Sequence, residues 1–233
     1  MKAVLLIGSP RLKKSASFTL GHYLLDRLAA RDVTGETRFV QRDLRSDETR
    51  EALTAAVAQT DLVILSTPLY VDSLPAPATR TLEVLAQRLD KRERPARQHF
   101  VAIVNCGFPE AAHNDVALAI CEQFARAAGF VWAGGLALGA GEAVKGRPLT
   151  ASSGMARNVI AALDQAAEAL AQGETIPDEA QALMRKPLIP PWMYRTMGQL
   201  SWILQSRQHG QLGKLRQRPW AASTNDGPKR KSI

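Results

Sequence analysis

Cysteine is scarce in this chain: its 233 residues include only Cys106 and Cys121. Two cysteines are too few for a disulfide framework, and they are typical of a reducing compartment. Long apolar runs are missing too, since no stretch reaches the roughly 18 apolar residues that can cross a bilayer. The first apolar run, Ala3 to Ile7, is short and has no small-residue cleavage site after it, which argues against a secretory signal. We therefore expect a cytoplasmic protein.

Histidine is scarce in the whole chain, and acidic residues are scarce in its C-terminal part. The chain has four histidines and no close group of His and Cys, so we expect no metal site. After residue 184 there are ten Lys or Arg but one acid, Asp226, which leaves residues 1–184 with a net charge of −1 out of the total +8. A nearly neutral body gives no support for nucleic-acid binding, and the basic character belongs to the C-terminal part.

Short apolar runs alternate with helical patterns through most of the chain. The expected strands are 3–7, 37–43, 62–66, 100–105 and 131–138, and the expected helices are 17–30, 47–59, 75–89, 115–128 and 155–171. This alternation predicts an α/β fold, a doubly wound five-stranded parallel sheet with helices on both faces. Ligands of such sheets bind outside the carboxyl ends of the strands.

The pattern changes after Gly173, where prolines and a basic, aromatic-rich segment follow. We expect a ligand-binding domain over 1–175, a helical C-terminal extension over 176–223, and a disordered basic tail over 224–233. The extension can cover apolar surface of its own subunit or of a dimer mate. Alternatively, its apolar helix with basic flanks can lie on an anionic membrane surface.

The most informative stretch runs from Gly8 to Ser17, directly after the first expected strand. It predicts a turn at the start of a helix, where backbone N–H groups and the helix dipole favour an anion. Hydroxyl groups and a planar guanidinium are available there as phosphate ligands, from Ser9, Arg11, Ser15 and Ser17. The simpler alternative is that a serine only caps the helix.

A nucleotide-binding P-loop is a weaker interpretation of the same stretch. Gly8 and Lys14-Ser15 fit that motif, but Lys13 stands where its second glycine is needed. The expected third strand also ends without an aspartate that could hold magnesium. We therefore disfavour a phosphotransferase.

Two further loops are expected at the same edge of the sheet. The loop after the third strand provides an apolar and aromatic wall for a flat ring, with Pro68, Leu69, Tyr70 and Val71. The loop after the fourth strand provides backbone amides for a polar ring edge, with Asn105, Cys106, Gly107 and Phe108. Cys106 has no second cysteine or base near it in the sequence, so we interpret it as a small strand-end residue and not as a redox thiol.

Taken together, these loops resemble the NAD(P)H-dependent FMN reductases of the flavodoxin superfamily. The resemblance covers about residues 1–172. It includes Pro75 with Arg80 and Glu83, which is similar to a Pro, Lys and Asp pattern of that family. It differs at Ala16, where the family often has Asn, and at Val71-Asp72, where many members have an aromatic residue.

The resemblance implies a flavodoxin-like fold, non-covalently bound FMN and a homodimer. It implies that Ser9, Arg11, Ser15 and Ser17 hold the phosphate, that Pro68, Leu69, Tyr70 and Val71 line the isoalloxazine, and that Asn105, Cys106, Gly107 and Phe108 close its polar edge. NADPH or NADH would donate electrons, and a quinone, flavin or similar small molecule would accept them. We predict no catalytic side chain, because the cofactor carries the hydride chemistry.

Two other functions remain open at this point. One is a flavodoxin-type electron carrier that binds FMN without nicotinamide turnover, although such carriers are usually strongly acidic. The other is an interaction module that keeps the fold without flavin. Membrane contact through the basic tail is a possibility that we do not favour, and nucleic acid is not an expected partner.

Overall fold

The structure is a computed structural model that describes residues 1–89, 95 and 97–217. It falls into two compact units, Met1–Pro190 and Pro191–Ile233. The domain boundaries expected from the sequence, at 175 and 223, stay a prediction. The expected tail of 224–233 lies outside the described residues. Within the described ranges, no helix is long and apolar enough to cross a membrane.

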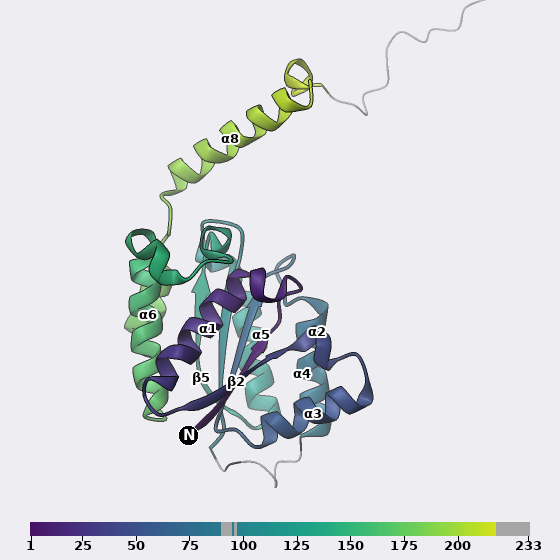
Figure 1. Ribbon diagram of the computed structural model, residues 1–233, viewed down its shortest axis with the longest axis vertical. Helices are drawn as coiled ribbons and strands as arrows, with labels where there is room; N and C mark the ends of the chain where they lie inside the picture. The colour runs from purple at the N-terminus through teal and green to yellow at the C-terminus, as the bar shows by residue number, and fades with distance from the viewer. Residues whose placement is uncertain (90–94, 96, 218–233) are drawn as a thin grey trace, which may run out of the picture. The chain divides into compact units, whose positions relative to one another are not determined.

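The first unit is built on a five-stranded parallel sheet in the order β2-β1-β3-β4-β5 (Figure 1). Its strands are β1 (Lys2–Ile7), β2 (Thr34–Phe39), β3 (Leu62–Pro68), β4 (His99–Asn105) and β5 (Val131–Leu138). Four of them, all but β2, are runs of buried residues, as expected for strands covered on both faces. The flavodoxin-like, doubly wound fold expected from the sequence is confirmed.

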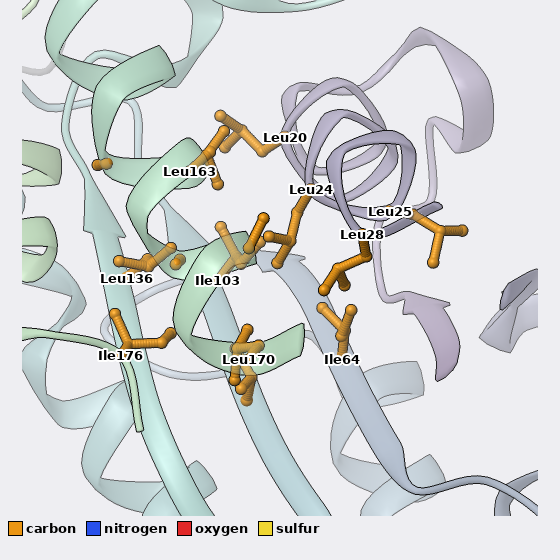
Figure 2. Packing of buried hydrophobic residues seen from close by; sticks show 14 of the residues in the cluster. Leu20, Leu24, Leu25, Leu28, Ile64, Ile103, Leu136, Leu163, Leu170 and Ile176 are labelled. Atoms are coloured by element: carbon orange, nitrogen blue, oxygen red, sulfur yellow. The ribbon is translucent and has the colours of Figure 1, made fainter. Parts of the chain in front are cut away.

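Helices cover both faces of this sheet. Those of the first unit are α1 (Ala16–Ala29), α2 (Val40–Asp43), α3 (Asp47–Ala58), α4 (Ala76–Arg88), α5 (Asp115–Ala128), α6 (Ser153–Ala171) and α7 (Asp178–Met184). One apolar cluster joins the sheet to α1, α6 and α7, and a second joins it to α3, α4 and α5. Figure 2 shows the first cluster, where leucines of α1 and α6 meet strand residues such as Ile64, Ile103 and Leu136.

The second strand differs from its expected position. The sequence pattern favours 37–43, whereas β2 ends at Phe39 and the next four residues form the helical turn α2. That turn buries Val40 and Asp43, and the Arg38 guanidinium bonds the Asp43 carboxylate at 2.8 Å. The partly buried ion pair and the buried valine explain why a short helix replaces the last part of the expected strand.

The carboxyl ends of β1, β3 and β4 lie level with one another. Ile7 is in register with Ser66 of β3, and Pro68 of β3 is in register with Asn105 of β4. The Gly8 amide donates to the Ser66 carbonyl at 2.9 Å. The three loops that follow these strands therefore start from one edge, at the point where the strand order reverses.

The second unit contains α8 (Pro191–Gln208) and a short 3-10 turn, η6 (Leu212–Lys214). Large apolar side chains of α8 are exposed, among them Trp192, Met197, Leu200 and Trp202. No acidic residue occurs between Arg185 and Gln217. The helical extension that the sequence predicts is therefore present, with an apolar and basic surface.

Candidate functional site

A cavity of about 100 Å³ lies where the loops after β1, β3 and β4 meet, and we call it the rim cavity. It is lined by Ser9, Arg11, Ser15, Ala16, Ser17, Pro68, Leu69, Tyr70, Asn105, Cys106, Gly107 and Glu142. The cavity thus gathers ten of the twelve residues predicted from the sequence. The two that it does not gather are Val71 and Phe108, which are exposed nearby in the chain.

The turn after β1 holds Arg11 at the edge of this cavity. The buried Ser9 hydroxyl accepts from the Arg11 amide at 3.3 Å, and the Ser9 carbonyl accepts from the Leu12 amide at 3.2 Å. Leu12 adopts φ 50°, a left-handed conformation that a leucine rarely takes. The turn is completed by the 3-10 segment η1 (Leu12–Lys14) and leads directly into α1.

The first turn of α1 provides backbone donors. Ser15 caps the helix, because its hydroxyl accepts from the Phe18 amide at 3.1 Å and donates to the Leu12 carbonyl at 2.6 Å. Among the described residues, the amides of Ala16 and Ser17 have no hydrogen-bond partner. Both residues line the rim cavity, so two free amides and the helix dipole make its α1 side a site for an anion.

Arg11 is held by a residue that the sequence did not single out. Its Nη1 lies 2.5 Å from Oε1 of Glu142, in the 3-10 turn η4 (Gly141–Val144) that follows β5. Lys145 bonds the other oxygen of the same carboxylate. Partial burial alone would raise the pKa of Glu142, but the hydrogen bonds from Lys145 and Arg11 outweigh it and lower the pKa. Glu142 is therefore anionic at neutral pH.

The feature of the sequence that points to Glu142 is the position of its loop after the fifth strand. β5 is parallel to its neighbours, so the loop after Leu138 reaches the same edge as the other three. Gly141, in this loop, permits a close approach to Asn105. A Cβ at Gly141 would lie 2.8 Å from Oδ1 of Asn105.

The Asn105 side chain ties three elements together. Its Nδ2 donates to the Ser17 hydroxyl at 2.8 Å and to the Thr67 carbonyl at 3.0 Å. These bonds join the end of β4 to the start of α1 and to the end of β3. Asn105 is buried, so this amide holds together the three elements that border the rim cavity.

Cys106 is a buried free thiol. Burial raises its pKa, although the contacts with the Phe108 backbone and the Asn114 side chain act in the opposite direction. Its Sγ lies 3.4 Å from the Phe108 carbonyl oxygen, and Nδ2 of Asn114 lies 3.6 Å from the same sulfur. Asn114 directly precedes α5, but its side chain makes no capping bond and contacts the thiol and two carbonyls.

The loop after β3 ends in a strained hairpin. The amide of Tyr70 donates to the Ser73 carbonyl at 2.9 Å, and the Ser73 amide returns a bond at 3.2 Å. Between them, Val71 and Asp72 have φ of 48° and 59°. Two-residue turns of this kind favour Asn and Gly, and a β-branched residue is unfavourable there. Val71 is 98% exposed, so the hairpin points it into solvent.

Other chemistry has little support in the described part of the chain. It contains no group of three or more His, Cys, Asp or Glu side chains that could hold a metal ion. The arrangement of the rim cavity therefore suits an anion held by amides, hydroxyls and a guanidinium, next to an apolar and aromatic loop.

Comparison with known proteins gives one family and one fold. Residues 1–143 match the model of a family described as NADPH-dependent FMN reductase. No curated protein matches the sequence.

Several solved structures share the fold. An apo NADH:FMN oxidoreductase is 19% identical, with a TM-score of 0.53 over 81% of this chain and 96% of that one. A flavone reductase is 12% identical, with a TM-score of 0.56 over 79% and 70% of the two chains. The NAD(P)H:quinone oxidoreductase of Methanothermobacter marburgensis is 14% identical, with a TM-score of 0.53 over 73% and 96%.

Proposed function

Because this chain belongs to the family of NADPH-dependent FMN reductases, we propose that the rim cavity binds the phosphate of FMN. The chain is accordingly an NAD(P)H-dependent flavin oxidoreductase. The single observation that carries the proposed site is the pair of free amides, Ala16 and Ser17, at a helix start beside Arg11. Amides, hydroxyls and a guanidinium are the donors that a phosphate dianion requires, so the residues present fit the cofactor.

The proposed roles of the other residues follow from their places around the cavity. Ser9, Ser15 and Ser17 supply hydroxyls near the phosphate. Pro68, Leu69 and Tyr70 face the flavin ring, and the backbone of Asn105, Cys106 and Gly107 meets its polar edge. The contacts predicted for Val71 and Phe108 stay predictions, because both side chains are exposed outside the cavity lining. Tyr70 is 45% exposed and a Cβ at Gly107 would meet nothing within 4 Å, so this side is open to solvent and to substrates.

When bound, FMN supplies the chemistry, taking a hydride from NADPH or NADH and passing electrons to a small acceptor such as a quinone or a flavin. The protein binds and orients the cofactor. Arg11 and Glu142 already form an ion pair, and the raised pKa of Cys106 makes its thiol a weak acid with no thiolate to act as a base, so none of the three is a ready proton donor or base. We propose no catalytic side chain.

An electron carrier without nicotinamide turnover is the alternative. A carrier of this fold docks on basic partners through an acidic surface. Here the body is nearly neutral and the C-terminal part is basic. The enzyme assignment therefore fits the charge distribution better than the carrier assignment.

The first experiment is an absorbance spectrum of the purified protein, followed by NADPH and NADH oxidation with a quinone. We expect a flavin spectrum and steady turnover. A flavin spectrum without turnover would support the carrier, and a protein that neither retains nor takes up FMN would refute the site.

Variants of the phosphate turn test the residues. Arg11→Ala is expected to weaken FMN binding, because a hydrogen bond to a charged group contributes about 1.5–3 kcal/mol. Ser15→Ala is expected to weaken it less, because the Ser15 hydroxyl donates to the Leu12 carbonyl and must give up that bond to reach the phosphate. Ser15→Ala also removes a helix cap, which costs about 1 kcal/mol of stability. Ser46→Ala is the matched control, because Ser46 caps α3 far from the cavity. It should lower stability by a similar amount and leave FMN affinity unchanged.

The remaining assignments rest on the family and the composition. We propose that the protein is cytoplasmic and forms a homodimer. We also propose that residues 1–175 form the FMN-binding domain and 176–223 a helical extension. α8 offers apolar side chains that a second copy could cover.

A further inference from the structure

A second and larger cavity lies on the outer side of the same turn, and we call it the α1 cleft. It has a volume of about 420 Å³ and lies between α1 and the loop 146–150. Its lining includes Lys13, Phe18, His22, Asp26, Arg147 and Leu149. A cavity of this volume is large enough for a nucleoside phosphate.

The turn after β1 and the start of α1 separate the α1 cleft from the rim cavity. Arg11, Ser15 and Glu142 line the rim cavity, whereas Lys13, Thr19 and Gly146 line the α1 cleft. Gly146 has φ 64°, and a Cβ built on it would lie 3.9 Å from the Lys14 carbonyl oxygen. The loop that carries Arg147 therefore lies close to the turn that carries Lys13. The cleft and the proposed phosphate site are thus lined by neighbouring residues of the same turn and of the start of α1.

One end of the cleft carries two cations without partners. Among the described residues, neither Lys13 nor Arg147 forms an ion pair, in contrast to Lys145, which bonds Glu142. At the other end, the His22 ring bonds the Asp26 carboxylate at 2.9 Å. The cleft therefore attracts a phosphate at the end that is nearer the start of α1 and repels it at the end with Asp26.

The wall between these ends is apolar. Leu149 is fully buried and forms the floor, while the half-buried Phe18 packs on Phe39 with ring centroids 6.1 Å apart. From Phe18 to Asp26 the helix rises about 12 Å. This distance accommodates a flat base and a sugar, with the phosphate at the basic end.

We propose that the α1 cleft binds the adenosine 2′-phosphate end of NADPH and makes the enzyme prefer NADPH to NADH. The proposal rests on the proposed function, because it assumes that a nicotinamide nucleotide reaches the flavin in the rim cavity. Lys13 and Arg147 pair with the 2′-phosphate, Arg147 through its planar fork. The base lies against Phe18 and Leu149. NADH lacks the phosphate that the two cations recognise, so it gains nothing from them.

A binding experiment tests the cleft without relying on turnover. The probes are adenosine 2′,5′-bisphosphate and 5′-AMP, titrated into the full chain by calorimetry. We expect the bisphosphate to bind the parent protein more tightly than 5′-AMP does. The double variant Lys13→Ala, Arg147→Ala should weaken the bisphosphate by tenfold or more and leave 5′-AMP nearly unchanged.

The matched control is Lys14→Ala. Lys14 lies in the same turn with the same charge, but it lines neither cavity. It should bind the bisphosphate like the parent. Equal losses in Lys14→Ala and in the double variant would show a general charge effect and overturn the proposal, as would a parent protein that does not bind the bisphosphate.

Kinetics then connect the cleft to the reaction. In the double variant we expect KM for NADPH to rise by tenfold or more, with KM for NADH and kcat for both unchanged. An unchanged ratio of kcat/KM for the two nucleotides would refute the cleft as the specificity site. If the protein binds the bisphosphate at the cleft but retains no FMN, the proposed function fails while the cleft assignment survives. If it retains FMN and oxidises NADPH without binding the bisphosphate, only the cleft assignment fails.

Discussion

The guanidinium of Arg11 and the carboxylate of Glu142 lie 2.5 Å apart at the edge of the rim cavity and join the turn after β1 to the turn after β5. Both side chains are more than half exposed, so the pair is weak and easily opened. An anion that binds Arg11 must compete with this carboxylate. At the proposed phosphate site, Glu142 therefore opposes the binding of an anion that Arg11 favours.

We predict that Glu142→Gln strengthens FMN binding. The substitution frees Arg11 and removes a negative charge next to the phosphate. An exposed ion pair contributes at most about 1 kcal/mol, so we expect FMN to bind about two- to fivefold more tightly. Fluorescence titration with FMN measures the effect, and riboflavin, which has no phosphate, should show none.

Glu83→Gln is the control for this prediction, because Glu83 forms a similar exposed pair with Arg80 away from the cavity. The lowered pKa of Glu142 keeps its carboxylate charged across the neutral range. The gain of the variant over the parent should therefore be the same from about pH 7 to pH 8, where the phosphate of FMN is mostly a dianion. Weaker FMN binding in Glu142→Gln would mean that Glu142 supports the phosphate site.

We predict that thiol reagents modify Cys106 slowly in the folded protein. Its raised pKa keeps the thiol protonated at neutral pH, and the thiolate is the reactive form. In the folded protein the alkylation rate should stay low around pH 7 and rise only above pH 9.0, the ordinary pKa of a cysteine thiol. In the unfolded chain the rate should rise around that ordinary pKa.

A Cys106→Ala variant supplies the background rate from Cys121. Complete burial raises the pKa of Cys121 to about 12, so this variant should be almost inert while folded. Rapid alkylation of the parent at pH 7, absent in Cys106→Ala, would identify Cys106 as an activated thiol and contradict the prediction.

We predict that Val71→Asn stabilises the protein. Val71 has φ 48° and is 98% exposed, so the substitution relieves backbone strain and loses almost no buried surface. The left-handed conformation costs an L-residue about 1–2 kcal/mol, and Asn tolerates it far better. Urea denaturation without added flavin should show a gain of about 1 kcal/mol in unfolding free energy.

Val116→Asn provides the comparison, because Val116 is exposed in the regular helix α5, where Val and Asn have similar propensities. Its unfolding free energy should hardly change. A Val71→Asn protein that is less stable than the parent would show that the Val71 side chain makes a stabilising contact in solution.

We predict that deletion of residues 191–233 lowers the number of chains in the oligomer in solution. The deletion removes α8 and its exposed tryptophans, which need an apolar partner. Deletion of 218–233 alone keeps α8 and should leave the oligomeric state unchanged. Light scattering measures both. If the longer deletion leaves the oligomeric state unchanged but abolishes binding to anionic vesicles, the membrane alternative replaces self-association.

Most of the fold could be predicted because local signals and burial agree. Strand β5 and helix α5 have the predicted bounds, and Gly129 ends α5 in the left-handed conformation that glycine favours. The second strand was displaced because Thr34–Phe39 is an exposed edge strand with no apolar run to mark it. The burial of Asp43 with Arg38 depends on the tertiary structure.

The site was predictable where residues follow strands in a recognisable order, and not where their role depends on pairing. The loops after β1, β3 and β4 meet as expected. The sequence could not show that Glu142 pairs with Arg11, because 131 positions separate them. It also could not show that the Asn105 side chain is used to join Ser17 and Thr67.

The Asn105 amide has a consequence for how this enzyme can diversify. One buried side chain joins the ends of β3 and β4 to the start of α1, so we expect changes at these positions to disturb retention of the cofactor and turnover together. The 70–73 hairpin closes on its own two backbone bonds and points Val71 outward. Its tip can therefore vary without disturbing the proposed cofactor site, and we expect changes of electron acceptor to arise there.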